Sequence, residues 1–365
     1  METTHRVHVG DARDLSALET DSVDLVVTSP PYPMIEMWDD VFAALDPAIG
    51  EALDAGDGQA AFEAMHDVLN AVWREVERVL APGGIACVNV GDATRSVDDR
   101  FRVYQNHARV VDAFQDLGFD PLPDVLWRKP VNSAAKFMGS GMVPTNAYVT
   151  LEHEYVLVFR NGGTRSFPPG DETRYESAYF WEERNRWFSD VWSELGGERQ
   201  TLANDELRER SGAFPLELPG RLVRMYSVYD DTVLDPFWGT GTTSLAAMVA
   251  GRNSVGVERD PAFVDAFDDR VRDVPSLSRD VNGTRLESHR EFVAETRAAG
   301  DELGYENEFY DVPVRTKQER GLRLYDATAV ETLSGDGSGV EAGNGTGVAA
   351  ARADRTYRVT HELHE

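Results

Sequence analysis

The chain has 365 residues, with 36 Lys and Arg against 64 Asp and Glu, a net charge of −28 and 41% hydrophobic residues. This length can bury a full core, and the hydrophobic content argues against an acidic disordered or interaction protein. The acidic residues are spread along the whole sequence, which is typical of a halophilic enzyme, because dispersed carboxylates keep a surface hydrated in molar salt.

The residue types present exclude several classes of protein. The single cysteine, Cys87, excludes a disulfide framework within the chain. No apolar run approaches the ~18 residues that a membrane span needs, and the N-terminus lacks a signal-peptide pattern. The histidines show no metal-ligand spacing. We therefore expect a cytoplasmic protein without a metal and without a membrane partner.

Strands and helices alternate through residues 1–160, as in α/β proteins. Val23–Thr28 is almost entirely apolar, which predicts a strand buried on both faces. Ala81-Pro82-Gly83-Gly84 is a strong helix stop signal. The expected strands are Arg6–Val9, Val23–Thr28, Ile85–Val90, Asp124–Trp127 and Leu151–Phe159, and the expected helices are Phe62–Leu80 and 106–117.

The second half of the chain begins with residues 161–210, which are rich in arginine and aromatic residues and lack periodicity. Beyond residue 274 the pattern is weaker, with one helix and strand-like pieces, and 335–347 is a glycine-rich linker. The expected elements are helices at Leu218–Tyr226, Thr242–Ala250 and Pro261–Val271, and strands at Thr232–Leu234, Ser254–Val257, Leu322–Tyr325 and Tyr357–Leu363.

Two stretches carry chemistry, and each follows an expected strand. Ser29-Pro30-Pro31-Tyr32 ends the first strand, because proline cannot donate to a sheet ladder. Asp235–Gly241 is a glycine-rich turn between a strand and a helix, and Glu258 follows about 20 residues later. Such a turn lets a ligand approach the backbone, and an acid at that spacing can bind ribose hydroxyls. In a doubly wound sheet both stretches face one crevice at the carboxyl ends of the strands.

Together these motifs resemble S-adenosylmethionine-dependent amino-methyltransferases of DNA. The order, catalytic motif before cofactor motif, resembles the circularly permuted β-group of that family. Further stretches match in order, among them "LAPGGIACVNVGD", "EHEYVLVFRN" and "SGAFPLELPGRLVRMYS". Ser211-Gly212 departs from the His-Pro of the family pattern. The resemblance covers roughly residues 5–270.

The resemblance implies a Rossmann-like, doubly wound α/β methyltransferase sheet, circularly permuted, with an inserted target-recognition region. Residues 1–160 would form the catalytic half, 161–210 the target-recognition region, 211–272 the cofactor-binding half, and 273–365 a C-terminal extension. The implied catalytic residues are Ser29, Pro30, Pro31 and Tyr32. The implied S-adenosyl-L-methionine contacts are Asp11, Phe214, Asp235, Pro236, Phe237, Gly239, Gly241, Thr242 and Glu258.

The substrate implied is the exocyclic amine of a base that is flipped out of duplex DNA. A serine in the first position of the tetrapeptide favours N4 of cytosine, and N6 of adenine is the alternative. A catalytically silent DNA-binding regulator on the same fold is a second alternative. Methylation at C5 of cytosine is excluded, because Cys87 lies within a strand and far from any Pro-Cys turn.

Double-stranded DNA is therefore the expected partner, and a cognate restriction endonuclease is a further one. Similarity to haloarchaeal members implies a short palindromic target such as CTAG. Arginine can read guanine edges and aromatic residues can hold unstacked bases. The expected DNA-binding residues are Trp38, Arg128, Lys136, Arg174, Arg184 and Arg186.

Overall fold

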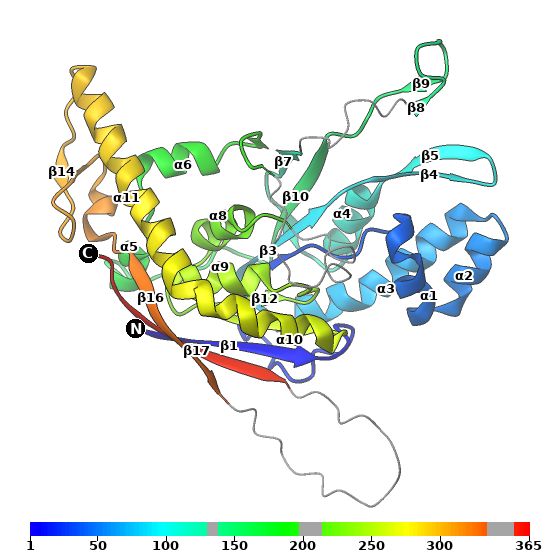
Figure 1. Cartoon of the computed structure of the whole chain (residues 1–365), viewed down its shortest axis with the longest axis horizontal. Helices are drawn as coiled ribbons and strands as arrows, with labels where there is room; N and C mark the ends of the chain where they lie inside the picture. The colour runs from blue at the N-terminus through cyan, green and yellow to red at the C-terminus, as the bar shows by residue number, and fades with distance from the viewer. Residues whose placement is uncertain (130–137, 197–213, 334–353) are drawn as a thin grey trace, which may run out of the picture.

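The computed structural model describes residues 1–129, 138–196, 214–333 and 354–365. Within these ranges an 11-stranded sheet forms the centre of the molecule (Figure 1). Its strands are, in spatial order, β11 (Val191–Trp192), β7 (Val125–Arg128), β10 (His153–Arg160), β3 (Leu80–Val90), β2 (Val23–Thr28), β12 (Thr232–Asp235), β13 (Asn253–Glu258), β1 (Glu2–Val9), β17 (Arg355–Leu363) and β16 (Tyr325–Leu333), with β6 (Asp120–Pro121) beside β10.

The five central strands, from β3 to β1, run parallel to one another. On either side the direction reverses, since β10 is antiparallel to β3 and β17 is antiparallel to β1. Side chains of β2 alternate between two cores, with Val26 in one and Leu25 and Val27 in the other. This double burial explains why β2 is almost wholly apolar.

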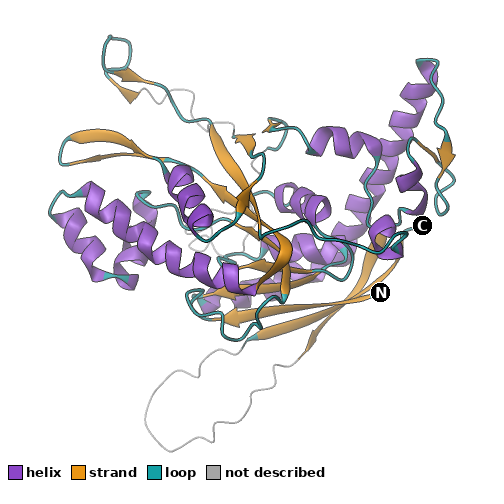
Figure 2. Cartoon of the chain, turned by 180° about the vertical axis from the view of Figure 1, so that it is seen from behind, coloured by secondary structure: helices purple, strands orange, loops and turns teal. Residues whose placement is uncertain are grey.

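Helices cover both faces of this sheet (Figures 1 and 2). The core on one face contains residues of α1 (Asp39–Leu45), α2 (Pro47–Asp54), α3 (Gly58–Val79) and α4 (Asn106–Asp116). The cores on the other face contain residues of α8 (Glu217–Tyr226), α9 (Thr242–Ala250), α10 (Pro261–Arg270) and α11 (Val274–Ala298). The structure thus confirms the expected doubly wound, Rossmann-like α/β fold.

The chain leaves β2 and β12 in opposite directions, although these two strands are neighbours in the sheet. After β2 it passes through α3 to β3 on one side, and after β12 it passes through α9 to β13 on the other. Such a topological switch opens a crevice at the carboxyl ends of the two strands, where ligands of α/β proteins bind. The fold therefore predicts a ligand-binding site at this edge of the sheet.

Two expected boundaries differ from the structure. Helix α3 ends at Val79, but the Ala81–Gly84 stretch belongs to β3, which bulges there. Gly83 adopts a φ of +83° and its N–H donates to Asn161 O, so the glycines bend the strand without breaking it. The expected strand Leu322–Tyr325 is also wrong, since β16 starts at Tyr325. The reason is that Leu324 N donates to the Tyr310 hydroxyl at 2.7 Å instead of to a strand.

Residues 161–196 contain two short helices, α5 (Glu172–Glu176) and α6 (Trp181–Trp187), which sequence periodicity does not reveal. Helix α6 packs on the C-terminal part of the chain. Phe180 is fully buried in a small core with Leu286 and Tyr310. The Arg285 guanidinium donates to both carboxylate oxygens of buried Glu183, at 2.6 and 2.9 Å. This part of the chain is therefore fastened to α11.

The C-terminal residues also extend the central sheet. Strand β17 pairs with β1, and β16 pairs with β17. Three two-stranded sheets lie outside it: β4 (Ala93–Val97) with β5 (Arg100–Tyr104), β8 (Met138–Gly139) with β9 (Ala147–Tyr148), and β14 (Tyr305–Glu306) with β15 (Pro313–Val314). The expected glycine-rich linker 335–347 lies outside the described residues. The division of the chain into four segments stays a prediction.

Candidate active site

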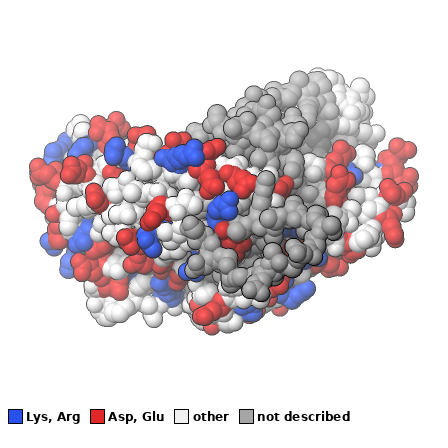
Figure 3. All heavy atoms as spheres, turned by 60° about the horizontal axis from the view of Figure 1, so that its bottom comes forward, with Lys and Arg blue, Asp and Glu red and all other residues white. Residues whose placement is uncertain are grey.

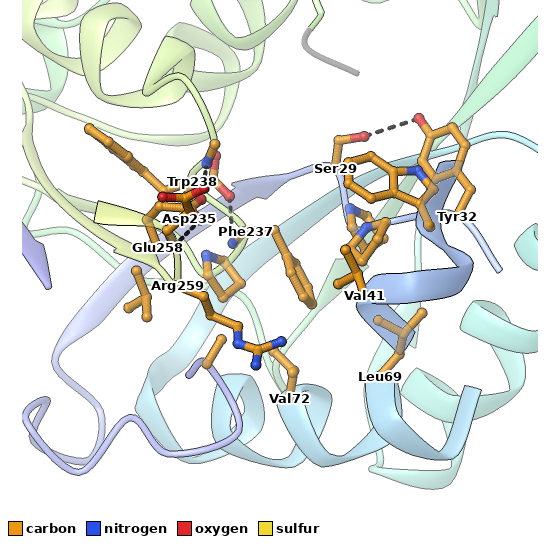
Figure 4. Close-up of a pocket in the computed structure, with 18 of the residues that line it drawn as sticks. Ser29, Tyr32, Val41, Leu69, Val72, Asp235, Phe237, Trp238, Glu258 and Arg259 are labelled. Atoms are coloured by element: carbon orange, nitrogen blue, oxygen red, sulfur yellow. Dashed lines mark hydrogen bonds between the residues drawn. The ribbon is translucent and has the colours of Figure 1, made fainter. Parts of the chain in front are cut away.

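Two loops that follow β2 and β12 line one cavity of about 990 Å³. Ser29 follows β2 directly and Asp235 ends β12, whose Leu234 pairs with Val26 of β2. Figure 4 shows Ser29 and Tyr32 on one side of this cavity and Asp235 on the other. The two stretches therefore face one crevice, as the sequence predicts.

Most of the residues singled out in the sequence line this cavity. They are Asp11, Ser29, Pro30, Pro31, Tyr32, Trp38, Phe214, Asp235, Pro236, Phe237, Gly239, Thr242 and Glu258. Gly241 belongs to the same turn but packs against the neighbouring helix α10. The apolar part of the wall comes from α1 and α3, including Val41, Leu69 and Val72 (Figure 4).

A hydrogen-bond network connects Ser29 to the neighbouring strands of the sheet. The Ser29 and Tyr32 hydroxyls lie 3.0 Å apart, and the Tyr32 hydroxyl donates to Glu154 Oε2 at 3.0 Å. Asn89 Nδ2 donates to the Tyr32 hydroxyl at 2.9 Å and to Glu154 Oε2 at 2.7 Å. The other oxygen of Glu154 forms an ion pair with Lys129.

This network has one consistent set of proton positions. A carboxylate only accepts hydrogen bonds, so the single proton of the Tyr32 hydroxyl points to Glu154. Burial and the nearby charge of Glu154 raise the pKa of Tyr32 well above its usual value, so the hydroxyl keeps that proton. Ser29 must therefore donate to Tyr32. The lone pairs of the Ser29 oxygen are left as acceptors on the cavity side.

Sequence reasoning missed Asn89, Lys129 and Glu154 as members of this site. Asn89 lies on β3, Lys129 follows β7, and Glu154 lies on β10. The three residues meet because β10 pairs with β3 on one side and with β7 on the other. Glu154 has an exposed fraction of only 9%, within a strand that continues as the buried, apolar run Val156–Phe159. A charged residue in such a strand was the available signal, since buried carboxylates need partners.

Asp235 connects the end of β2 to the glycine turn. Its carboxylate accepts from Thr28 Oγ1 at 2.6 Å and from Phe237 N at 3.1 Å. Burial raises the pKa of Asp235 to about 6, and hydrogen bonds from Thr28 and Thr243 oppose this rise. Asp235 therefore holds the two loops in one geometry, in addition to lining the cavity.

The glycine turn depends on close packing beneath it. Gly241 has a φ of +77°, and a Cβ there would lie 2.5 Å from Phe267 and 2.6 Å from Trp238. The Trp238 indole donates to Ser244 Oγ at 2.8 Å, which fixes its ring under the turn. The turn then leads directly into α9, whose N-terminal N–H groups favour an electronegative ligand.

Glu258 closes the turn from the neighbouring strand. Its carboxylate oxygens accept from Gly239 N and Asp260 N, each at 2.8 Å. Burial raises the pKa of Glu258 above its usual value. A carboxylate has about four lone-pair sites, so Glu258 can also accept hydroxyl hydrogens from a ligand.

Asp11 lies at the rim of the cavity, next to the end of β13. Burial works to raise its pKa, but hydrogen bonds from Arg13 outweigh this and hold the pKa below its usual value. Arg13 Nη2 donates to Asp11 Oδ2 at 2.8 Å, and Arg259 Nε lies 3.8 Å from the same oxygen. Asp11 is therefore a charged group at the cavity mouth.

The residues after the tetrapeptide divide between core and cavity. Met34 is 1% exposed and its N–H donates to Met65 Sδ, so it belongs to the core. Trp38 is half-buried and lines the cavity at the end of the 3₁₀ helix η1 (Glu36–Trp38), beside Met37, which is 47% exposed. Met37 and Trp38 therefore contribute to the cavity wall, within ten residues of Ser29 in the sequence.

The arginines expected to contact DNA do not gather at this cavity. Arg128 is exposed at the end of β7, at the same edge, and pairs with Glu152 at 3.3 Å. Arg174 and Arg184 line a second cavity of about 720 Å³ that also contacts Asp24, at the start of β2. They therefore lie at the opposite edge of the sheet. Arg186 is exposed on α6, and Lys136 lies outside the described residues.

Membrane spans and metal clusters are both missing from the described parts of the chain. Among these residues no helix is long and apolar enough to cross a membrane. Among the same residues no group of three or more His, Cys, Asp or Glu side chains is placed to hold a metal ion.

Comparison with known families gives a direct match. The model of the N6/N4 DNA methylase family, described as "DNA methylase", matches residues 23–269. That range includes Ser29–Tyr32, the glycine turn and Glu258.

Curated relatives agree with this match. The chain is 49% identical over 328 residues to the Type II methyltransferase M.MthZI of Methanothermobacter thermautotrophicus, covering 89% of this chain and 91% of that protein. It is 47% identical over 280 residues to the Type II methyltransferase M.MjaI of Methanocaldococcus jannaschii, covering 74% and 91%.

Solved structures share the fold. TTHA0409 of Thermus thermophilus, a candidate DNA modification methylase solved with S-adenosyl-L-methionine, is 36% identical with a TM-score of 0.58, over 74% of this chain and 95% of that chain. The cytosine-N4-specific PvuII DNA methyltransferase is 20% identical with a TM-score of 0.51, over 73% and 86%, which shows a common fold. The chain belongs to the N6/N4 family of DNA methyltransferases, with S-adenosyl-L-methionine as its cofactor.

Proposed function

We propose that this enzyme methylates the N4 amine of cytosine in duplex DNA, after the base has been flipped out of the helix. The observation that supports this most is the position of Ser29-Pro30-Pro31-Tyr32 in the same cavity as the glycine turn. An acceptor site for an amine and a site for a methyl donor then lie within one cavity. Methyl transfer depends mainly on such positioning.

The chemistry needs acceptors at the amine. The lone pair of an exocyclic amine is delocalised into the base, so the amine is a poor nucleophile. Two acceptors on its hydrogens draw the nitrogen toward tetrahedral geometry and release the lone pair. The Ser29 oxygen is one such acceptor, because its own proton is directed to Tyr32. The Pro30 carbonyl is the second, and the Tyr32 ring offers a face to the base.

The same network offers a path for the proton that the methylated amine must lose. Ser29 accepts this proton while its own passes to Tyr32, and the Tyr32 proton passes to Glu154. Glu154 takes up this proton on the oxygen that faces Tyr32, and its other oxygen faces Lys129. We therefore propose Glu154 as a positioning residue that sets the direction of the hydrogen bonds from Ser29 to Tyr32 and from Tyr32 to Glu154.

The cavity fits the cofactor. Its volume of about 990 Å³ suits a nucleoside-sized ligand with an adjoining base. S-adenosyl-L-methionine supplies an electrophilic methyl group when it is bound. We propose that Glu258 accepts from ribose hydroxyls with its remaining lone pairs. The turn at Gly239 and the N-terminus of α9 would face the methionine part, with Phe214 and Phe237 as apolar walls.

Cytosine is proposed over adenine because serine occupies the first position of the tetrapeptide. The order of the two motifs supports the permuted β-group, since β2 precedes β12 in the chain while the two lie side by side in the sheet. The target CTAG and the haloarchaeal type remain proposals based on the sequence resemblance. The relatives are named Type II methyltransferases, so we also propose a cognate restriction endonuclease as a partner.

Methyl transfer from labelled S-adenosyl-L-methionine to unmethylated plasmid DNA tests this function. The assay is run in buffer with molar KCl, and the DNA is then digested to nucleosides for mass analysis. We expect N4-methylcytosine. Detection of N6-methyladenine would show that adenine is the substrate and not cytosine. An absence of any methyl transfer would instead favour a silent DNA-binding regulator. Duplexes with and without CTAG then test the target.

A further inference from the structure

The two hairpins at the catalytic edge of the sheet have no role in the chemistry described above. The first, β4–β5, is separated by two residues from the end of β3 at Val90. The second, β8–β9, lies between Lys129, just beyond β7, and the start of β10, whose Tyr155 pairs with Val90. Both hairpins therefore start from the edge that carries Ser29, and Figure 1 shows both projecting from the body of the molecule.

The β8–β9 hairpin differs from the rest of the chain in charge. Residues 138–151 (MGSGMVPTNAYVTL) contain no charged residue, although 27% of the chain is Asp, Glu, Lys or Arg. For an enzyme with a net charge of −28, this is a segment that a DNA phosphate can approach without meeting a carboxylate on it. The acidic surface elsewhere would repel the phosphate wherever salt does not screen this repulsion (Figure 3).

The hairpin also presents apolar side chains to solvent. Met142 is 84% exposed, Val149 83% and Val143 63%. Among the large hydrophobic residues that the structure describes as exposed, these three have the highest exposed fractions. Exposed apolar residues that cluster on one element mark an interaction surface.

Contacts at the base of the hairpin hold it in place. The ring of Tyr148 on β9 stacks on Phe101 of β5, with centroids 4.9 Å apart and planes 13° apart. Strand β5 also carries two arginines, Arg100, which is exposed, and Arg102. The first hairpin is itself braced by α3, since a Cβ at Gly58 would lie 2.3 Å from the Tyr104 hydroxyl. An uncharged apolar tip is thus accompanied by arginines on the neighbouring hairpin.

We infer that the β8–β9 hairpin enters a groove of the DNA duplex, with Met142 and Val143 at its tip as the apolar contact with the bases. This inference rests on the proposed function. Proteins that distort DNA insert apolar side chains between base steps, and a flipped base leaves a gap that such side chains fill. Recognition of DNA is thereby assigned to the catalytic edge, and not to Arg174 and Arg184 at the opposite edge.

The experiment compares a Met142→Glu/Val143→Glu variant with a Tyr305→Glu variant. Tyr305 is 43% exposed on β14, so it is a control for placing a glutamate at an exposed hydrophobic side chain. We measure the KM for unmethylated plasmid DNA and the Kd for S-adenosyl-L-methionine. The hairpin variant should raise the DNA KM by about tenfold or more while the cofactor Kd stays within about twofold of wild type. The control should change neither.

A second measurement detects contact directly. Cys87 is fully buried, so a Met142→Cys variant carries one accessible thiol. A photoactivatable crosslinker on that thiol should attach to duplex DNA, whereas the same reagent on a Tyr305→Cys variant should not. An unchanged DNA KM together with no crosslink would overturn the inference. If the wild-type enzyme transfers no methyl group at all, the proposed function fails first, and the two failures are distinguishable.

Discussion

The Ser29 hydroxyl is the atom on which the proposed chemistry depends at the residue scale. A Ser29→Ala variant loses the acceptor but keeps the backbone that shapes the cavity. We expect kcat to fall by about 10² to 10³, as when one preorganised polar contact is removed from an active site, with little change in the Kd for S-adenosyl-L-methionine. Ser22→Ala, on the exposed loop before β2, is the matched control. An equal loss of kcat and of cofactor affinity would assign Ser29 a structural role.

Glu154 is expected to act through the direction of hydrogen bonds. Glutamine has the same shape but can also donate, so the Tyr32 proton in a Glu154→Gln variant is free to point to Ser29. Ser29 then loses an acceptor site, and we expect kcat to fall about tenfold or more while the DNA KM changes little. Glu152→Gln, at an exposed residue two positions earlier, is the control. Equal activity of both variants would contradict the role of the network.

The buried carboxyl of Asp235 predicts a pH dependence of stability. Its pKa of about 6 in the folded state lies above its ordinary value of 3.8. The folded state therefore binds this proton more tightly, and the resulting stability is present at low pH and lost as pH rises through about 6. Relative to Asp235→Asn, the free energy of unfolding of the wild type should fall by about 2–3 kcal/mol between about pH 4 and pH 7. Denaturant titrations at several pH values measure this difference, and parallel curves for the two proteins would contradict it.

At the scale of an element, the turn between β12 and α9 depends on a glycine for two separate reasons. Gly241 has a positive φ, and it also has no space for a Cβ beside Phe267 and Trp238. Gly170 has a similar φ of +78°, but a Cβ added there would meet nothing within 4 Å. Gly170→Ala should cost about 1 kcal/mol from backbone strain alone.

Gly241→Ala should cost more, about 3 kcal/mol or above, and should abolish cofactor binding, because Trp238 and Phe267 must move. Thermal melts and cofactor titrations of both variants test this. If the two glycine variants lose equal stability, the close packing under the turn does not matter.

Strands and helices could be predicted from the sequence more accurately than the contacts between them. Buried strands such as β2 and helices such as α3 can be predicted, because their hydrophobic patterns repeat within a short stretch of sequence. The site around Ser29 was half predicted, since the tetrapeptide and the glycine turn are recognisable along the chain. Asn89, Lys129 and Glu154 were not, because their meeting depends on the antiparallel insertion of β10 between β3 and β7.

On the scale of the whole molecule, the position of the C-terminal residues could not be predicted from the sequence either. Strand β17 pairs with β1 across most of the length of the chain, so no local pattern could place it in the sheet. From the sequence, the aromatic residues of 161–196 could either contact DNA or belong to the core. Phe180, Trp187 and Trp192 are core residues, and Phe180 is buried beside Leu286 of α11. Long-range packing decides between these two outcomes.

The dispersed negative charge predicts a dependence on salt. Carboxylates on the face that Figure 3 shows lie close to one another, and their repulsion is screened when the Debye length falls to ~3 Å near 1 M salt. We expect Tm to rise as KCl increases from about 0.5 M to about 3 M. Thermal unfolding in a KCl series measures this, and a Tm that stays constant or falls would reject the halophilic prediction.

The most direct test of the central claim is the identity of the methylated nucleoside. Unmethylated plasmid DNA is incubated with the wild-type enzyme and with Ser29→Ala at a saturating concentration of S-adenosyl-L-methionine, then digested and analysed by mass spectrometry. We predict N4-methylcytosine from the wild type, and at least about a hundredfold less of it from the variant in the same time. N6-methyladenine as the product, or equal yields from the two proteins, would contradict this claim.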